Sequence, residues 1–580
     1  MSATRSPEGS GTNEPRLAVY VCQCGGNIGD YIDTQHVIDV VRDLPGVRVA
    51  RDAMFTCSDS NQQEMIDDIA RESLDGFVVA CCSPKLHTFT FRGVAERAGV
   101  NPYRVTQVNL REQCSWTHTD DPAGATRKAI RLVTAGVARA CHGTALEPVQ
   151  VSTTPCVAVI GGGVAGMRAA IGLADVGLDV CLVELEAELG GWTGRFGELF
   201  PRGVSGRALV RRMRQEIASR PGIEVLTGAR VVGKSGTYGN YRVTIAIGDA
   251  TTERTVGQIV VATGFDAYEP VAGEFGYGSP GVVTLPEFRR LLDETDGPIV
   301  HDGRTVRSIA YIYCVGSRTD GHAYCSRYCC SAAAQASLLV ADRDPDLQQY
   351  HLYRDLRTYG RNEVLFGESR RRGSYYLRFA DDDPPQVSVD GEGVSITVHD
   401  LLTAGAELTV AADLLVLVTG MVPRPEDDLI AALKLPVGRD GFLNEIHPKL
   451  RPVETVVDGV LIAGACQAPK TVAESVASGM AAAAQAAAVL KRGVASLDPQ
   501  VAIVHDAACD GCGECVAACP FGAIALAGSD GHAVATISAS GCKGCGACTP
   551  VCPIGAIDLQ GYTDEQVRAM IVGLLDGGVR

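Results

Sequence analysis

Short apolar runs alternate with polar stretches of helical period along much of this chain, a pattern typical of an α/β protein. Residues 17–21 predict a buried strand, 61–71 a helix and 77–80 a second buried strand. Further on, residues 156–163 predict a strand followed by a glycine turn, and residues 164–176 predict the helix after it. A βαβ unit is therefore expected to begin at residue 156.

The domain organisation follows from length and from two short linkers. A chain of 580 residues is too long for one hydrophobic core, so we expect two to four domains. The linkers lie at 147–155 and 492–499. We predict a disordered tail at 1–15, a small α/β domain at 16–147, a long α/β domain at 156–495, a cysteine-rich α+β domain at 500–560 and a C-terminal helix at 561–580.

Charge and hydropathy exclude several classes of function. The formal net charge of -16 argues against binding to nucleic acid or to anionic lipid, both of which require a basic surface. Apolar runs such as 413–421 and 480–490 are shorter than the roughly 20 residues that span a bilayer. The first 15 residues lack the apolar stretch of a secretory signal. We therefore expect a cytoplasmic protein that is not integral to a membrane.

Cysteine is the informative residue, because a chain without a secretory signal has little use for 22 of them as disulfides. Eight lie near the C-terminus in two repeated runs, each closed by Cys-Pro. This is the spacing of bacterial two-cluster ferredoxins, in which three ligands of each [4Fe-4S] cluster come from one run and the fourth from the other. A zinc ribbon is the alternative, but it needs neither the third cysteine nor the Cys-Pro. The predicted sets are Cys509, Cys512, Cys515 and Cys552 for one cluster and Cys542, Cys545, Cys548 and Cys519 for the other.

A dinucleotide fingerprint opens the long α/β domain. Gly161, Gly163 and Gly166 form a G-x-G-x-x-G turn, and Glu184 follows about 20 residues later, where a ribose acceptor belongs. Three later features resemble the FAD half of the thioredoxin-reductase and glutathione-reductase class. They are Gly190-Gly191, the strand 259–262 closing on Thr263-Gly264, and Gly464 leading into a helix. The resemblance implies FAD in a Rossmann-type fold; NAD at this site is the alternative.

One motif departs from that class. Its members commonly carry Gly-Asp in the last motif, whereas this chain has Gly464-Ala465-Cys466-Gln467. Lys470 follows, and it either places a cation near the flavin or is a solvated loop lysine.

A second nucleotide-binding turn is expected after the strand 307–313, but cysteines stand there instead. The chain continues with Cys314-Val-Gly-Ser-Arg318 and then Cys325, Cys329 and Cys330. We interpret these four as ligands of a third [4Fe-4S] cluster. Buried structural cysteines are the alternative. The flavin is then expected to exchange electrons with clusters, without hydride transfer from NAD(P)H.

These features together resemble the A subunit of the heterodisulfide reductase family. The resemblance covers nearly the whole chain, and its remaining motifs are Val21-Cys-Gln-Cys-Gly25, Met54-Phe-Thr-Cys-Ser58, Ala80-Cys-Cys-Ser-Pro-Lys85 and Arg111-Glu-Gln-Cys-Ser-Trp116. It implies one more cluster in the N-terminal domain, with ligands drawn from Cys22 or Cys24, Cys57, Cys82 or Cys81, and Cys114. We take Cys24, Cys57, Cys82 and Cys114 as that set; reduced core cysteines are the alternative.

The resemblance also implies a function and partners. Longer family members carry a ferredoxin insertion in the FAD domain, but residues 223–264 contain no cysteine, so four clusters are expected. We expect an electron-transfer subunit, with or without flavin-based bifurcation, that works with heterodisulfide-reductase-like B and C subunits or another redox subunit. Ferredoxin or a dehydrogenase is the expected donor, and a homodimer within a larger complex is the expected assembly. The alternatives are a flavoprotein subunit of a quinone-interacting oxidoreductase complex and a stand-alone NAD(P)H-dependent flavin reductase.

Overall fold

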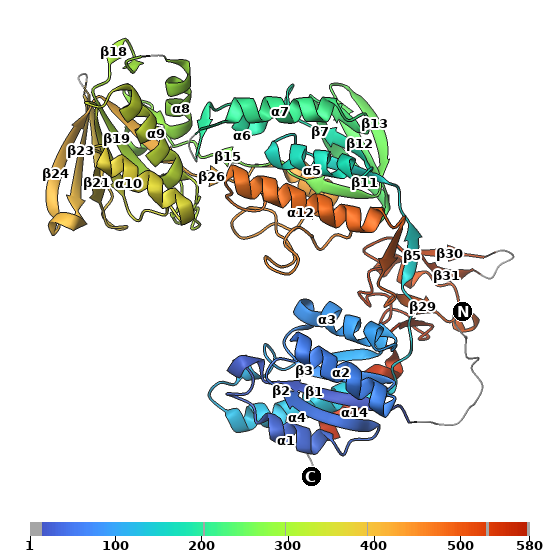
Figure 1. The fold of residues 1–580 in the computed structure, drawn as a ribbon. Coiled ribbons are helices and arrows are strands. Elements are labelled where there is room, and N and C mark those ends of the chain that lie inside the picture. Colours follow the sequence, from blue (N-terminus) through green and yellow to red (C-terminus); the bar gives the residue numbers. More distant parts are fainter. Residues whose placement is uncertain (1–13, 201–202, 296, 391–392, 529–532, 577–580) are drawn as a thin grey trace. The chain divides into compact units, whose positions relative to one another are not determined.

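The computed structural model describes residues 14–200, 203–295, 297–390, 393–528 and 533–576 (Figure 1). The chain forms two compact units. One unit contains the residues up to Gln150 together with those from Ser496 onwards, and the other spans Val151–Ala495. The predicted tail at 1–15 lies outside the described residues except for its last two positions.

The N-terminal part of the first unit is a four-stranded parallel sheet in the order β2-β1-β3-β4. The strands are β1 (Leu17–Cys22), β2 (Val47–Ala53), β3 (Gly76–Cys81) and β4 (Val105–Asn109), and the helices are α1 (Thr34–Val41), α2 (Asp59–Glu72), α3 (Pro84–Arg97) and α4 (Pro122–Cys141). Every residue of β1 and β3 is buried. The apolar runs at 17–21 and 77–80 therefore form central strands, as expected for a sheet covered on both faces.

The cysteine-rich part of the same unit is small and built from short elements. Its antiparallel pairs are β29 (Ala502–Val504) with β32 (Ile557–Leu559) and β30 (Ile524–Ala527) with β31 (Val534–Ile537), and a short helix, α13, spans Glu514–Ala518. Cysteines make up much of its core, where Cys515 and Cys548 are buried beside Ile524 and Ile557. So few apolar residues make a weak core alone, and ligation is expected to supply much of its stability.

The last helix, α14 (Asp564–Asp576), packs against α4 of the N-terminal part. Arg139 on α4 donates to the carbonyl of Gly561 at 2.8 Å, and its guanidinium lies 3.9 Å from the ring centroid of Tyr562. Gln566 donates to the carbonyl of His142 at 3.1 Å. The chain thus returns to its first domain, and the first and last predicted domains share one unit.

The first half of the second unit holds a five-stranded parallel sheet in the order β10-β7-β6-β14-β27. Its strands are β6 (Cys156–Ile160), β7 (Asp179–Val183), β10 (Ile223–Leu226), β14 (Gln258–Val261) and β27 (Val460–Ile462). Its helices are α5 (Val164–Asp175), α6 (Gly191–Gly194), α7 (Gly206–Ala218), α11 (Asp427–Leu433) and α12 (Val472–Leu490). An antiparallel meander follows β10: β11 (Ala229–Thr237), β12 (Asn240–Ile247) and β13 (Ala250–Val256). We call this part the FAD half.

The second half repeats the plan with a parallel sheet in the order β16-β25-β19-β20-β21. Its strands are β16 (Val282–Thr284), β19 (Ser308–Val315), β20 (Gln348–Tyr353), β21 (Tyr375–Arg378) and β25 (Leu414–Thr419), and its helices are α8 (Leu285–Glu294), α9 (Cys329–Arg343) and α10 (Glu363–Arg371). A second meander contains β22 (Gln386–Asp390), β23 (Gly393–Asp400) and β24 (Ala406–Ala412). The short strands β15 (Asp266–Ala267) and β26 (Met421–Val422) pair where the two halves join. We call this part the cysteine half.

Helix α12 is longer than the apolar run at 480–490 suggested. Among the described helices it alone is long and apolar enough to cross a membrane by length and composition. One face of the helix packs against α5 (Figure 1), and a Cβ at Gly479 would collide with the carbonyl of Ala165. The small residues on this face allow the close contact between the two helices.

The contact between α14 and α4 can be tested at Gly573. A Cβ built there would lie 3.0 Å from the Cα of Ala135, whereas one at Gly93 on α3 meets nothing within 4 Å. We expect Gly573→Leu to separate the helices, because overpacking costs about 1–3 kcal/mol. Amide hydrogen exchange of α14 should accelerate about tenfold or more. Gly93→Leu is the matched control; equal exchange in both variants would show that α14 does not depend on this contact.

Candidate functional site

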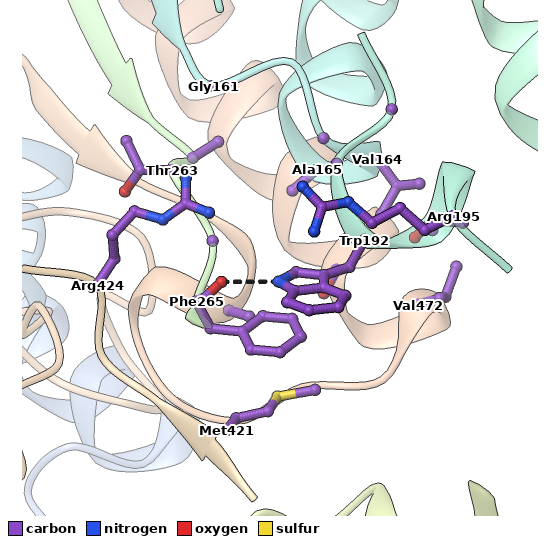
Figure 2. A pocket seen from close by; sticks show the side chains of 18 of the residues that line it. Gly161, Val164, Ala165, Trp192, Arg195, Thr263, Phe265, Met421, Arg424 and Val472 are labelled. Carbon is purple, nitrogen blue, oxygen red and sulfur yellow. Dashed lines mark hydrogen bonds between the residues drawn. The ribbon is translucent and has the colours of Figure 1, made fainter. Parts of the chain in front are cut away.

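A cavity of about 370 Å³ opens at the carboxyl ends of the strands in the FAD half (Figure 2). The predicted residues lining it are Gly161, Gly163, Glu184, Gly191, Thr263, Gly264 and Lys470. Gly161 has φ +106 and lies against the Ala262 carbonyl, so only glycine suits that turn. Gly163 has nothing within 4 Å of a built Cβ. Open space in front of this glycine is what a pyrophosphate needs to reach the start of α5.

Two other fingerprint glycines shape the cavity from behind its wall. A Cβ at Gly166 would collide with the carbonyl of Gly161, and one at Gly464 would lie 2.7 Å from the Cβ of Ala165. These glycines allow α5 to sit close to the turn and to the chain before α12. They serve packing, and neither lines the cavity itself.

Glu184 is fixed by backbone hydrogen bonds, one of them from the glycine turn that begins at Gly161. Its carboxylate accepts from the backbone N–H of Gly162 at 2.5 Å and of Glu186 at 2.8 Å. The side chain is buried at the end of β7. This position, at the rim of the cavity, suits the ribose contact that the sequence predicts.

Aromatic rings line one side of the cavity, and the motif search did not identify them. Trp192 stacks on Phe265, with ring centroids 5.8 Å apart, and donates from Nε1 to the Phe265 carbonyl at 3.0 Å (Figure 2). Arg195 lies 4.6 Å from the Trp192 ring. Their only sequence signal is their place directly after Gly191 and Gly264.

Cations also face this cavity. Lys470 donates to the carbonyl of Gly464 at 3.1 Å and to Gln467 at 2.6 Å, and burial lowers its pKa. Arg289 on α8 is 6% exposed, and its Nη1 has no hydrogen-bond partner among the described residues. Lys470 is therefore fixed by hydrogen bonds to the chain before α12. The buried Arg289 has one N–H group left to donate to a ligand. Both fit an anionic, hydrogen-bonding cofactor such as FAD.

The four central cysteines lie where β19 meets α9. Cys314 is near the end of β19 with φ +63, Cys325 is in the connecting loop, and Cys329 and Cys330 open α9. Burial, followed by the neighbouring Cys330, raises the pKa of Cys314 to about 11. A hydrogen bond between the adjacent thiols raises the pKa of Cys329 and lowers that of Cys330. The four sulfurs interact electrostatically, so the structure brings the predicted set together.

Arginines surround these sulfurs. Arg318 and Arg354 interact with Cys314, and Arg357 hydrogen-bonds Cys325. Arg318 and Arg354 are each only 14% exposed. Cysteine must lose its proton to bind metal, and nearby guanidinium groups favour the thiolate.

The N-terminal cysteines gather at the carboxyl edge of the first sheet. Cys24, at φ +53, interacts electrostatically with Cys22 and Cys82, and Cys57 interacts with all three. Arg111 donates to the Cys24 sulfur at 3.4 Å. A hydrogen bond from Cys81 lowers the pKa of Cys82.

Cys114 lies apart from this group. Its thiol is fully buried and donates to the Ala125 carbonyl on α4 at 3.1 Å, and the charge that acts on it is that of Lys128. Cys22, rather than Cys114, accompanies Cys24, Cys57 and Cys82.

Among the C-terminal cysteines, the structure brings one of the two predicted crossover sets together. Cys519, Cys542, Cys545 and Cys548 line one small cavity, although Cys519 comes from the other run. Gly511, Gly513, Gly544 and Gly546 all have positive φ. Each run repeats one bond: Ala523 donates from its backbone to Cys519 at 3.3 Å, and Ala556 donates to Cys552 at 3.2 Å. Cys509 interacts with Cys515 and accepts from the Ala535 backbone at 3.4 Å, while Cys512 is exposed.

The distance between cysteine ligands differs between a four-iron cluster site and a site for a single metal ion. In the described residues, no three Cys, His, Asp or Glu side chains lie close enough to hold one metal ion. A four-iron cube holds its cysteines further apart than a tetrahedral zinc ion does.

Two parts of the chain match known protein families. Residues 508–556 match the family of 4Fe-4S dicluster domains, and residues 155–309 match the pyridine nucleotide-disulphide oxidoreductases. Among solved structures, thioredoxin reductase from T. acidophilum aligns with 57% of this chain and 97% of its own, at 18% identity and a TM-score of 0.41.

Curated relatives extend over almost the entire chain. The iron-sulfur A subunit 2 of CoB–CoM heterodisulfide reductase from Methanopyrus kandleri is 37% identical over 90% of this chain and 92% of its own length. The A subunit of H(2):CoB-CoM heterodisulfide,ferredoxin reductase from Methanothermobacter thermautotrophicus is 35% identical with the same coverage. The chain is therefore an oxidoreductase with FAD and [4Fe-4S] clusters, and it belongs to the family of heterodisulfide reductase iron-sulfur A subunits.

Proposed function

We propose that this chain passes electrons between its flavin and its clusters through the central cysteine site, as a subunit of a heterodisulfide-reductase-like complex. One observation carries the proposal. The segment from Cys314 to Cys329 stands where a second nucleotide-binding turn would connect β19 to α9, and it has a cysteine at each end. A tight glycine turn would bring phosphates to the helix; this loop brings thiolates.

The residues around each cofactor support that role. FAD supplies two-electron chemistry that can also proceed one electron at a time, and clusters supply one-electron steps. Gly163 leaves room for a pyrophosphate, Glu184 lies where it would meet the ribose, and Trp192 with Phe265 would offer an apolar side to the bound flavin. Lys470 lies before α12, where its charge and the helix N-terminus would both favour an anionic reduced flavin.

The ligand sets follow from which sulfurs converge. For the N-terminal site we propose Cys22, Cys24, Cys57 and Cys82, replacing Cys114 in the set expected from sequence. Cys82 is preferred over Cys81 because hydrogen bonding favours its thiolate. For the centre we propose Cys314, Cys325, Cys329 and Cys330, and for the C-terminal part we retain the two crossover sets.

The proposal also includes the electron donor, the acceptors and the assembly of this chain. One relative, the A subunit of the "Ferredoxin/F(420)H(2)-dependent CoB-CoM heterodisulfide reductase" of Methanosarcina acetivorans, has a name that points to ferredoxin as a partner of that protein. We propose ferredoxin or a dehydrogenase as donor, B and C subunits as acceptors, and a homodimer within the complex. All 22 cysteines are free, which suits the reducing cytoplasm. Bifurcation requires two acceptors of different potential, and co-purifying subunits would identify them.

The cofactor content is the first test. Purified without oxygen, the chain should hold one FAD and about sixteen iron atoms, four for each of four cubes. Iron and flavin assays on the same sample give both numbers. A count of about eight iron atoms would eliminate the central and N-terminal clusters.

The flavin site is tested at Gly163. Because a built Cβ there meets no protein atom within 4 Å, Gly163→Val should fold and place its side chain in the cavity. We expect FAD retention to fall at least tenfold while the iron content stays constant. Gly367→Val on α10, where a Cβ also meets nothing, is the control. Normal flavin content in Gly163→Val would contradict the FAD assignment.

The central cluster is tested by replacing Cys329 and Cys330 with Ser. A hard hydroxyl replaces a soft thiolate poorly, so about four iron atoms should be lost while FAD is kept. Flavin bleaching by reduced ferredoxin should become much slower, and NADH should reduce neither form. Cys156→Ser on β6 is the control. Unchanged iron, or an unchanged bleaching rate, would make these cysteines structural, and rapid reduction by NADH would favour the flavin-reductase alternative.

A further inference from the structure

One arginine connects a central cysteine to the FAD half. Arg327 lies between Cys325 and Cys329, and its backbone N–H donates to the Cys325 sulfur at 3.3 Å. Its guanidinium donates to the Glu474 carboxylate at 2.6 Å and to the Tyr359 hydroxyl at 3.2 Å. The Tyr359 hydroxyl itself donates to Glu474 at 3.1 Å. These three side chains form a bridge between the cysteine loop and α12.

The Glu474 end of the bridge is firmly fixed. Glu474 is the third residue of α12 and completes a capping box with Thr471, accepting from the Thr471 backbone at 2.8 Å. Lys470, Thr471 and Ser475 line the flavin cavity. A capped helix start is a rigid attachment point. Any residue held by Glu474 is therefore held relative to the flavin.

The Arg327 end is strained. Arg327 has φ +61, a conformation unfavourable for a side chain with a Cβ, and Cys314 and Arg318 in the same loop share it. Such strain persists only where the surroundings hold it, and it collects at functional sites. Here the hydrogen bond from the Arg327 backbone to the Cys325 sulfur and the ion pair with the Glu474 carboxylate keep Arg327 in this conformation.

We propose that Arg327 is a positioning residue that sets the distance between the Cys325 sulfur and the flavin-binding helix. The inference rests on the proposed function, since it assumes a cluster on Cys325. In each transfer the reduced cluster loses one electron and the flavin gains one. Two transfers with two protons from solvent reduce the flavin fully. Because electron transfer slows steeply with distance, loosening the bridge slows this step without removing either cofactor.

The test compares flavin bleaching in full-length chains loaded with iron and FAD and mixed with dithionite. Arg327→Gln and Glu474→Gln each remove the ion pair, and the glutamine oxygen can still cap α12. Each should slow bleaching about fivefold, which corresponds to the upper range for a partly exposed ion pair. The double variant should be no slower than either single one, because both act through one contact. Arg327→Lys should recover most of the rate.

The controls separate this role from a structural one. Arg361→Gln changes an exposed arginine of the same region and should bleach at the normal rate. High salt should slow the unchanged chain but not Arg327→Gln, because salt screens a half-exposed pair. The Cys329/Cys330→Ser chain gives the rate of direct reduction. Normal bleaching in Arg327→Gln, additive losses in the double variant, or loss of iron from Arg327→Gln would overturn the proposal. Full iron in the Cys329/Cys330→Ser chain would instead overturn the proposed function beneath it.

Discussion

The convergence of cysteine sulfurs that are distant in sequence is the constraint on which the redox sites depend. Four thiolates at one point repel one another, and a cube with four of them carries net negative charge. The chain already carries a net charge of -16, so each site needs local positive potential. Backbone N–H groups supply it in the C-terminal part, through Ala523 and Ala556. Guanidinium groups supply it elsewhere, through Arg111 in the N-terminal domain and Arg318, Arg354 and Arg357 at the centre.

The parallel sheets solve the geometric side of the same problem. In a parallel sheet the carboxyl ends of the strands share one edge, so loops after different strands meet there. Cys22 is the last residue of β1, Cys82 follows β3, Cys314 is near the end of β19, and the flavin cavity opens at the ends of β6, β7 and β14. Two of the cysteines, Cys24 and Cys314, themselves have positive φ, which marks a sharp turn of the chain at each sulfur. A strained backbone is the cost of pointing a ligand inward.

The sequence was enough to predict a site where the residues that form it lie close together along the chain. The Gly161–Gly166 turn and three cysteines of each C-terminal run lie within one short segment, so their spacing alone is enough to predict them, and the repeated Cys-Pro motif predicts the fourth cysteine. The N-terminal set was different, because strand order decides which loops meet. Cys114 lies in one of the motifs that resemble the family, yet its thiol donates to a carbonyl of α4, and it is Cys22 that interacts electrostatically with Cys24. The sequence did not identify Trp192 and Phe265 as cavity residues for the same reason, because only the fold brings these two aromatic residues together. The docking of α14 on α4 depends on contacts across more than 400 residues, which no periodicity reveals.

The arginines of the cysteine half explain how a nucleotide-binding plan can accommodate a cluster. In a Rossmann-type half, the residues after the second strand contact the ribose of the nucleotide. An arginine there can bind the 2′-phosphate of NADP. Arg354 and Arg357 follow β20, the strand beside β19. A phosphate group and a thiolate-ligated cube are both compact anions, so guanidinium groups that stabilise one stabilise the other. In the proposed arrangement only the loop after β19 changes, with sulfur in place of the glycine turn, while the electrostatics of the surrounding sheet edge can remain. Such an arrangement would favour single-electron transfer, which needs only proximity, over hydride transfer, which needs a nicotinamide stacked against the flavin.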